Sequence, residues 1–395
     1  MKRFIFSVIA LLVAATACTE SGIIDMPEFY GNPISFDTYI GKNPMTKADN
    51  VDINYLKGLD PNGNVYASAI VGAQVYAYPC ESDVANKSAD IVDFGSAYLD
   101  GRLLWHDDPD NTKDGWRYNI FKNNTWIVDE PYMPSGKDLA VVAYNLGASN
   151  GTTPCISNET ATGFTFTVKD NVAEQVDLLA TPLTFVSENV NGDTEVPIRF
   201  YHLLSRVGFK VLSTSSSATE IQISSIKLRG AFPKEGHVSL ISAIATPSSI
   251  QAQENPIPSI TAATDENKYT YEYNLFGSGE EFTIASSACV GGENNPGAQP
   301  IYANKKTNDN TFVGNQLNRY MMIMPGSQSN LSVEVSYKLA GESITNVVNV
   351  NIGNINFRAG YAYEFILKIA TAAIEFSGEV VVGDWTDPQT PTPLN

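Results

Sequence analysis

Few residues of this chain are arranged for hydrolytic chemistry. Residues 147–151 read Gly-Ala-Ser-Asn-Gly and fit the G-x-S-x-G pattern that surrounds a nucleophilic serine. That arrangement needs a helix directly after the serine, whereas Thr152, Thr153 and Pro154 follow here. Proline and β-branched residues do not start such a helix. We therefore interpret this segment as a surface turn and expect no catalytic residue and no enzyme activity.

An acidic segment between Trp105 and Trp116 is the one candidate for metal binding. Carboxylate oxygens of this kind can hold Ca²⁺, but their spacing does not fit the D-x-[DN]-x-[DN]-G loop. We favour a solvated loop and expect no metal site. The residues concerned are His106, Asp107, Asp108, Asp110 and Asp114.

Histidine is too sparse to indicate a zinc or acid–base site. The three histidines, His106, His202 and His237, are far apart in the sequence. His202 stands in an apolar run, which favours a structural hydrogen bond. We expect no cofactor.

Cys18 ends an N-terminal export signal. Lys2 and Arg3 precede an apolar run at residues 4–13, and small residues fill most of positions 14–17. The run is shorter than the ~20 residues that span a bilayer, which is typical of a cleaved signal. A cysteine after small residues resembles a bacterial lipoprotein box, and this resemblance implies cleavage between Ala17 and Cys18 and a lipid such as palmitate on the Cys18 thiol. The alternative is an ordinary signal with a coincidental cysteine.

The composition limits the possible partners. The chain has 43 acidic and 25 basic residues and a net charge of −18. Such a surface repels phosphate backbones, so we expect no nucleic acid partner. Apart from Cys18, whose thiol would carry the lipid, the cysteines are Cys80, Cys155 and Cys289. An odd number cannot form a complete disulfide framework; Cys80 and Cys155 could pair, but scattered small hydrophobic residues are the favoured interpretation.

The local pattern indicates β-structure almost throughout. Apolar residues alternate with polar ones in segments bounded by Gly, Pro, Asn and Asp, which predicts strands with one buried and one solvated face. The clearest examples lie at residues 331–337, 348–352 and 361–367, and residues 139–144 form a short apolar run. We predict an all-β fold of the sandwich type.

The length predicts two domains of ordinary size. The polar stretch at residues 187–195 is the favoured boundary. The predicted division is a signal peptide at residues 1–17, a lipidated segment at 18–47 that a protease can remove, an N-terminal domain at 48–194 and a C-terminal domain at 195–395.

Several segments, in order along the chain, resemble the fimbrillin family of Bacteroidales fimbrial subunits, Mfa-like lipoproteins among them. They are Ile34-Ser35-Phe36, Thr46-Lys47-Ala48, Trp126 with Pro131-Tyr132-Met133-Pro134, residues 139–145, Asp177-Leu178-Leu179-Ala180, residues 200–207, residues 319–325, Gly360-Tyr361-Ala362-Tyr363 and Asp384-Trp385-Thr386-Asp387. The resemblance implies two transthyretin-like β-sandwich domains in tandem, export as a lipoprotein and assembly into an adhesive surface filament.

A removable strand is expected near the N-terminus of the mature chain. Residues 34–40 carry apolar or β-branched side chains at positions 34, 36, 38 and 40, so one face of this strand can be buried. In fimbrillins a trypsin-like protease is thought to cut after such a strand, and Lys47–Ala48 is the candidate bond, ahead of Lys42 and Lys57. Loss of the strand leaves a groove that another chain can fill by strand addition. The alternative is a plain N-terminal strand that is never removed.

The candidate donor strand lies near the C-terminus. Ile374, Phe376, Val380 and Val382 share one face with Gly378, and Glu375, Ser377 and Glu379 share the other. This alternation suits a groove that takes every second side chain. An ordinary last strand of the C-terminal domain needs the same pattern, so both interpretations stay open.

The predicted function is that of a shaft or tip subunit of an adhesive fimbrium, active in cell adhesion and biofilm formation. Its expected partners are other fimbrial subunits of the same or another kind, the outer membrane through the lipid, and a host or bacterial glycan or protein. The alternative is a monomeric glycan-binding surface lipoprotein, which would present sugar-stacking aromatics; core packing explains these aromatics equally well. They are Trp105, Trp116, Tyr118, Trp126 and Tyr132.

Overall fold

The computed structural model is an all-β molecule, which confirms the predicted fold class. It describes residues 30–40, 72–82, 87–106, 115–145, 155–189, 192–213, 220–245, 257–285, 299–305, 317–318, 320–339, 341–370, 373–384 and 387–393. Within these ranges the helical structure is limited to three short 3₁₀ turns, at Ala89–Ile91, Val172–Glu174 and Glu266–Lys268.

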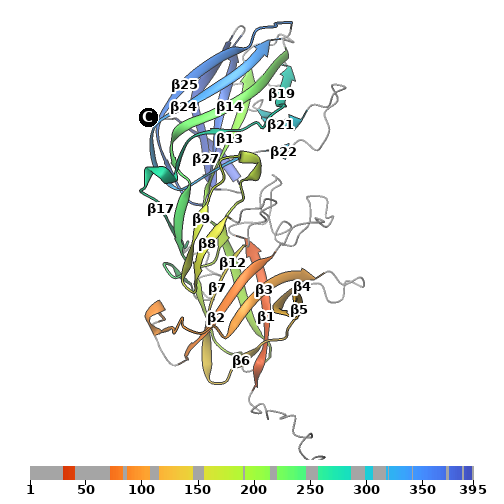
Figure 1. Cartoon of the computed structure of the whole chain (residues 1–395), viewed down its shortest axis with the longest axis vertical. Helices are drawn as coiled ribbons and strands as arrows, with labels where there is room; N and C mark the ends of the chain where they lie inside the picture. The colour runs from red at the N-terminus through yellow and green to blue at the C-terminus, as the bar shows by residue number, and fades with distance from the viewer. Residues whose placement is uncertain are drawn as a thin grey trace, which may run out of the picture.

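The strands form four sheets along an elongated molecule (Figure 1). The first sheet lies at one end and has the order β5-β4-β3-β2-β7-β10-β12-β1-β6, with β11 and β16 paired beside it. Its strands are β1 (Tyr30–Ile40), β2 (Ala73–Glu81), β3 (Leu99–His106), β4 (Gly115–Lys122), β5 (Thr125–Val128), β6 (Tyr132–Pro134), β7 (Lys137–Asn145), β10 (Leu179–Ala180), β11 (Leu183–Val186), β12 (Thr194–His202) and β16 (Ile244–Ala245).

A four-stranded sheet of order β17-β15-β9-β8 occupies the middle of the molecule (Figure 1). It joins segments that are distant in sequence, because β15 pairs with β9. Its strands are β8 (Ile156–Thr160), β9 (Gly163–Thr167), β15 (Glu235–Ser239) and β17 (Ser259–Ala262).

The two remaining sheets form the other end of the molecule (Figure 1). One has the order β20-β13-β26-β27-β28 with β23 beside β13, and the other has the order β22-β21-β19-β14-β24-β25 with β18 beside β14. Their strands are β13 (Ser205–Ser213), β14 (Glu220–Pro233), β18 (Tyr269–Asn274), β19 (Glu280–Ala285), β20 (Gln299–Pro300), β21 (Tyr302–Lys305), β22 (Leu317–Asn318), β23 (Met321–Ile323), β24 (Gly326–Leu339), β25 (Asn346–Phe357), β26 (Tyr361–Ala370), β27 (Ala373–Asp384) and β28 (Asp387–Pro393).

Two hydrophobic cores lie on opposite faces of the first sheet. On β7, Leu139 and Val141 belong to the small core, which includes Ile34 and Phe36 of β1. The alternate residues of β7, such as Val142, belong to the large core, which runs through the other three sheets. The period of two in a strand separates the two sets of side chains.

The alternation predicted for residues 331–337 is confirmed on β24, whose apolar residues are buried while the serines and Glu334 between them are half-exposed. The solvated face predicted for residues 361–367 is wrong. Both alternate sets of β26 side chains are buried, Tyr363 and Phe365 on one face and Ala362 and Ile366 on the other. Glu364, at 5% exposure, forms an ion pair with Lys210 at 2.5 Å.

The segment predicted as a boundary, residues 187–195, lies directly before β12 and includes the first two residues of that strand. That strand pairs with β1 and β10, so most of the segment from residue 195 to 202 lies in the first sheet with the N-terminal strands. After β12 the chain passes into the next sheet at β13 and returns to the first sheet at β16, which pairs with β11. The division into two domains stays a prediction.

Candidate functional site

Strand β1 is held in the first sheet between two strands from later in the chain. It runs parallel to β12, with Phe36 opposite Val196 and Thr38 opposite Ile198, and antiparallel to β6. The Ile34 N–H also donates to the carbonyl oxygen of Pro131 at 2.8 Å. The predicted strand at residues 34–40 is therefore present and closes a gap in the sheet.

The predicted period of two in β1 is confirmed where side chains are described. Ile34, Phe36 and Thr38 are buried, whereas Ser35 and Asp37 between them are exposed. Ile34 and Phe36 belong to the small core with Tyr118, Met133, Val196 and Ile198, and departure of β1 would leave a groove lined by these four residues. We call this the β1 groove.

The side chains of β1 lie beside those of β12 in the sheet, at the outer part of the small core. Ile34, Phe36 and Thr38 retain 7–9% exposure, whereas Val196 and Ile198 on the neighbouring strand retain 0–1%. Burying an isoleucine or phenylalanine side chain contributes about 1.5–3 kcal/mol. Loss of β1 would thus expose apolar groove residues and leave the backbone groups of β12 unpaired.

Tyr118 forms the wall of the groove opposite β1. Its ring stacks on that of Phe36 with a centroid distance of 6.3 Å. A Cβ atom at Gly101 would lie 2.7 Å from Tyr118 Cε2, so a glycine is needed beneath the ring. The Tyr118 hydroxyl accepts a hydrogen bond from the Asp100 N–H at 2.9 Å, and burial raises the pKa of Tyr118 to about 12.

Polar contacts hold the beginning of β1. The Asn32 N–H donates to Glu188 Oε1 at 2.9 Å, and the Asn32 side-chain amide donates to the carbonyl oxygen of Asn189. Asn189 is itself fixed by Thr194 and Asp193. The polar stretch predicted as a boundary therefore holds the removable strand in place, a role that its composition did not indicate.

One buried polar atom in β1 is poorly satisfied. Thr38 Oγ1 is buried and has no hydrogen-bond partner among the described residues. Burying a hydroxyl without a partner costs about 1–3 kcal/mol. A parallel ladder such as that between β1 and β12 is also slightly less stable per residue than an antiparallel one. Both features lower the free energy with which β1 is held, so a strand without them could bind at the same place more tightly.

The candidate donor segment forms β27. This strand pairs antiparallel with β26, with Phe376 opposite Leu367 and Val380 opposite Phe365. On its other side it pairs with β28. The other predicted positions, Ala17, Cys18, Lys47 and Ala48, lie outside the described residues.

The aromatic residues near β3–β5 serve mainly in packing. Tyr118 is buried, Trp116 packs against the small core, and Trp105 meets Trp116 at 73° with a centroid distance of 5.7 Å. The Arg102 guanidinium lies 4.2 Å from the centroid of the Trp126 ring. These described rings do not form a flat platform.

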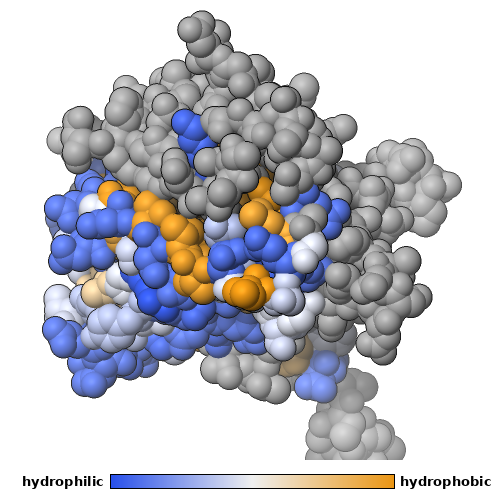
Figure 2. Space-filling view, turned by 90° about the horizontal axis from the view of Figure 1, so that it is seen from above, coloured by the Kyte–Doolittle hydropathy of each residue, from blue (hydrophilic) through white to orange (hydrophobic). Residues whose placement is uncertain are grey.

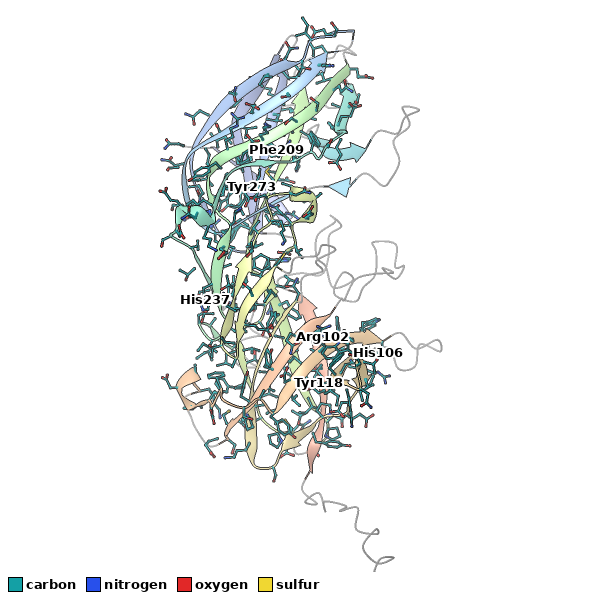
Figure 3. The ribbon with its side chains drawn as sticks, viewed as in Figure 1. Arg102, His106, Tyr118, Phe209, His237 and Tyr273 are labelled. Carbon is teal, nitrogen blue, oxygen red and sulfur yellow. The ribbon has the colours of Figure 1, made fainter. Side chains whose placement is uncertain are left out.

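Titratable groups are dispersed or paired in the interior. His106 and His237 lie in different parts of the molecule (Figure 3), and His237 is exposed. His202 Nδ1 lies 2.6 Å from Asp177 Oδ2, a buried pair that confirms the predicted structural role of His202. In the described ranges no group of three His, Cys, Asp or Glu residues could hold a metal ion. The acidic segment from Asp107 to Asp114 and the G-x-S-x-G segment lie outside those ranges.

The two described cysteines, Cys80 and Cys155, are buried and free. Burial raises the pKa of both thiols. They pack as small hydrophobic residues in the large core, as the favoured interpretation of the sequence predicts. No helix among the described residues has the length and apolar character to cross a membrane.

A family model described as fimbrillin-like matches residues 105–385. The chain belongs to the fimbrillin-like family. Among solved structures, a fimbrial protein from Bacteroides vulgatus is similar at 16% identity and a TM-score of 0.52, with coverage of 90% of this chain and 100% of that one. A candidate cell adhesion protein from Bacteroides ovatus has 12% identity and a TM-score of 0.47, with coverage of 90% and 99%. A search of curated protein sequences gives no match.

The B. vulgatus structure supports the fold of this fimbrillin-like protein over nearly its whole length. Family membership confirms the resemblance deduced from the ordered sequence segments. Sequence reasoning missed β12 as the partner of β1, although Val196, Ile198 and Phe200 alternate visibly. It also missed Glu188, for which the sequence holds no signal.

Proposed function

We propose that this fimbrillin-like protein is a shaft or tip subunit of an adhesive surface fimbrium, assembled by protease-triggered strand exchange at the β1 groove. Family membership supports the fimbrial role. The observation that carries the mechanism is the position of β1, a single strand that completes the small core. Within it, the buried hydroxyl of Thr38 lacks a hydrogen-bond partner among the described residues. Adhesion and biofilm formation would follow from the filament.

The proposed trigger is cleavage after Lys47. That bond lies between β1 and β2 in the sequence. After cleavage β1 would be held only by noncovalent contacts: its pairing with β12 and β6, the hydrogen bonds of Asn32 and the burial of its side chains. Its departure would no longer have to move the rest of the chain, and an extended segment of another subunit could enter the β1 groove.

The proposed donor is the segment with Ile374, Phe376, Val380 and Val382. Its pairing with β26 in the single chain has to be exchanged for pairing in the groove of the next subunit. Strand β28 is a poorer donor, because Pro388, Pro391 and Pro393 supply no N–H to a ladder.

The test uses a chain that begins at residue 19 and is then cleaved with trypsin. It compares two substitutions that each introduce a carboxylate into the proposed donor segment. Phe376→Asp should prevent polymers, detected by electron microscopy and size-exclusion chromatography, while Ser377→Asp on the alternate face serves as the matched control. Lys47→Ala should reduce polymer in the otherwise unchanged chain and in the Ser377→Asp chain. If Phe376→Asp instead unfolds the uncleaved monomer and Ser377→Asp does not, residues 374–382 are an ordinary core strand and the donor assignment is wrong.

The proposed anchor is a lipid on Cys18, which would place the precursor in the outer membrane before assembly. Cys18→Ala should abolish incorporation of a labelled fatty acid, with Cys289→Ala as the matched control. Label that persists on the Cys18→Ala protein would refute the lipoprotein proposal.

A further inference from the structure

Strand β25 (Asn346–Phe357) lies at the end of its sheet, and its pairing with β24 is regular from Asn346 to Asn351. In the described part of the chain it pairs on one side only, with β24. Its 12 residues contain no charged residue and no proline. Natural sheets usually protect such edges with lysine, proline, a bulge or a short strand, because the unpaired N–H and C=O groups accept a further strand.

The other strands at the ends of the described sheets have that protection, and β18 (Tyr269–Asn274), which pairs only with β14, includes Glu272. Strands β5, β6, β8, β17, β20 and β22 have five residues or fewer. Strand β28 has seven residues but includes Pro388, Pro391 and Pro393. Among these edges β25 therefore stands apart in both length and composition.

The side chains near this edge are unusually apolar for their exposure. Val347 is 58% exposed, and Ile344 in the turn before it is 73% exposed. Figure 2 views the molecule from the end at the top of Figure 1, where hydrophobic residues are visible among hydrophilic ones. On the inner face, Val348 is half-buried although its partner on β24, Val335, is fully buried.

The side-chain pattern of β25 suits a second copy of this chain as the occupant, because a two-fold axis at Asn349 would set the half-buried Val348 of one copy opposite the half-buried Val350 of the other. The net charge of −18 opposes contact between two copies over most of their surface. Strand β25 brings no carboxylate to the contact, and a strand paired antiparallel with itself is complementary about a two-fold axis. The straight part of the strand ends before Gly353, whose φ of +89° accompanies an irregularity in the pairing with β24.

We propose that β25 is an interaction edge that pairs antiparallel with β25 of a second copy. A two-fold axis at Asn349, the middle of residues 346–352, places Val348 of one copy opposite Val350 of the other on the inner face. The half-buried valines then cover each other, and the sheet continues from one copy into the next. The contact is lateral and needs neither cleavage nor strand exchange, so it goes beyond the proposed function.

The first test is the association of the uncleaved, unlipidated chain from residue 19, with Cys289→Ser, by sedimentation velocity. We expect a dimer whose population rises with protein concentration and with NaCl, because salt screens the repulsion between two acidic copies. Asn349→Lys and, separately, Asn351→Lys should each weaken the dimer at least tenfold. Ser336→Lys on β24, opposite Val347, is the matched control and should leave it unchanged; melting temperatures verify folding.

The second test is cross-linking in the same background. Residues directly opposite in an antiparallel pair have Cα atoms about 4.5–5.5 Å apart, within disulfide range. Asn349→Cys should form a disulfide-linked dimer on mild oxidation, whereas Ser336→Cys should not. A chain that stays monomeric at high concentration and salt would overturn the proposal, and so would a dimer that tolerates both lysine variants or cross-links equally from position 336.

Discussion

The two hydrophobic cores of this molecule differ in how many elements they depend on. The large core passes through all four sheets and contains Phe209 and Phe365, whose rings lie 5.6 Å apart. The small core lies on one face of the first sheet, and β1 covers one side of it with Ile34 and Phe36. One strand can thus leave the small core while the large core holds the rest of the chain together. This difference makes local strand exchange compatible with a stable subunit.

The largest expected effect comes from a cavity in the large core. Phe365→Ala should lower the free energy of unfolding by about 3–5 kcal/mol, because the residue is fully buried and its neighbours cannot collapse around the gap. Chemical denaturation should show one cooperative loss of structure. If the first sheet unfolded separately in this variant, the large core would not hold the whole chain together, and the proposed difference between the two cores would be wrong.

Phe36→Ala should affect only the small core. We expect a loss of about 3 kcal/mol, at the lower end for such a change, because the side chain lies at the rim of the β1 groove. Hydrogen exchange should accelerate in β1 and β12 and stay slow in β24 and β26. Faster exchange throughout the molecule would show that the two cores are not independent.

Tyr118 should report directly on whether β1 covers the groove. Burial raises its pKa to about 12 in the intact chain. Because the folded pKa exceeds the ordinary value of about 10, the stabilisation tied to the neutral hydroxyl is full below pH ~10 and is lost as the pH rises towards 12. In a cleaved chain without β1, NMR titration should show a lower pKa. The Tyr118→Phe variant identifies the NMR signal of Tyr118. An unchanged pKa of Tyr118 after cleavage would mean that its side chain stays covered.

Thr38→Val should stabilise β1 by about 1 kcal/mol, because it replaces a buried hydroxyl lacking a partner among the described residues with a methyl group. Release of β1 after cleavage should then be slower, measured by chromatography of the cleaved protein. Thr38→Ser, which keeps the hydroxyl, is the control. Destabilisation by valine would show that the hydroxyl is hydrogen-bonded in solution.

The smallest effect is expected at the beginning of β1. Glu188→Gln keeps an oxygen that can accept from the Asn32 N–H, whereas Glu188→Ala removes it. Alanine should cost about 0.5–1 kcal/mol and glutamine less. Equal stability of the two variants would show that the hydrogen bond does not help to hold β1 and that burial of its side chains is sufficient.

Local patterns in the sequence predicted strands more reliably than their partners. Alternation at residues 34–38 gave the correct buried face because one side of β1 is solvated. The same reasoning failed at β26, where side chains on both faces are buried and Glu364 forms an ion pair with Lys210. The parallel pairing of β1 with β12 joins residues about 160 positions apart, and no local pattern encodes it. The same limit hides the contact of Asn32 with Glu188.

The most direct test of the account is the mass of the N-terminal peptide of subunits in purified surface filaments. The account predicts that subunits begin at Ala48 and lack β1, while unassembled precursor retains it. Filaments whose subunits begin at Cys18 and still contain residues 30–40 would contradict strand exchange at the β1 groove.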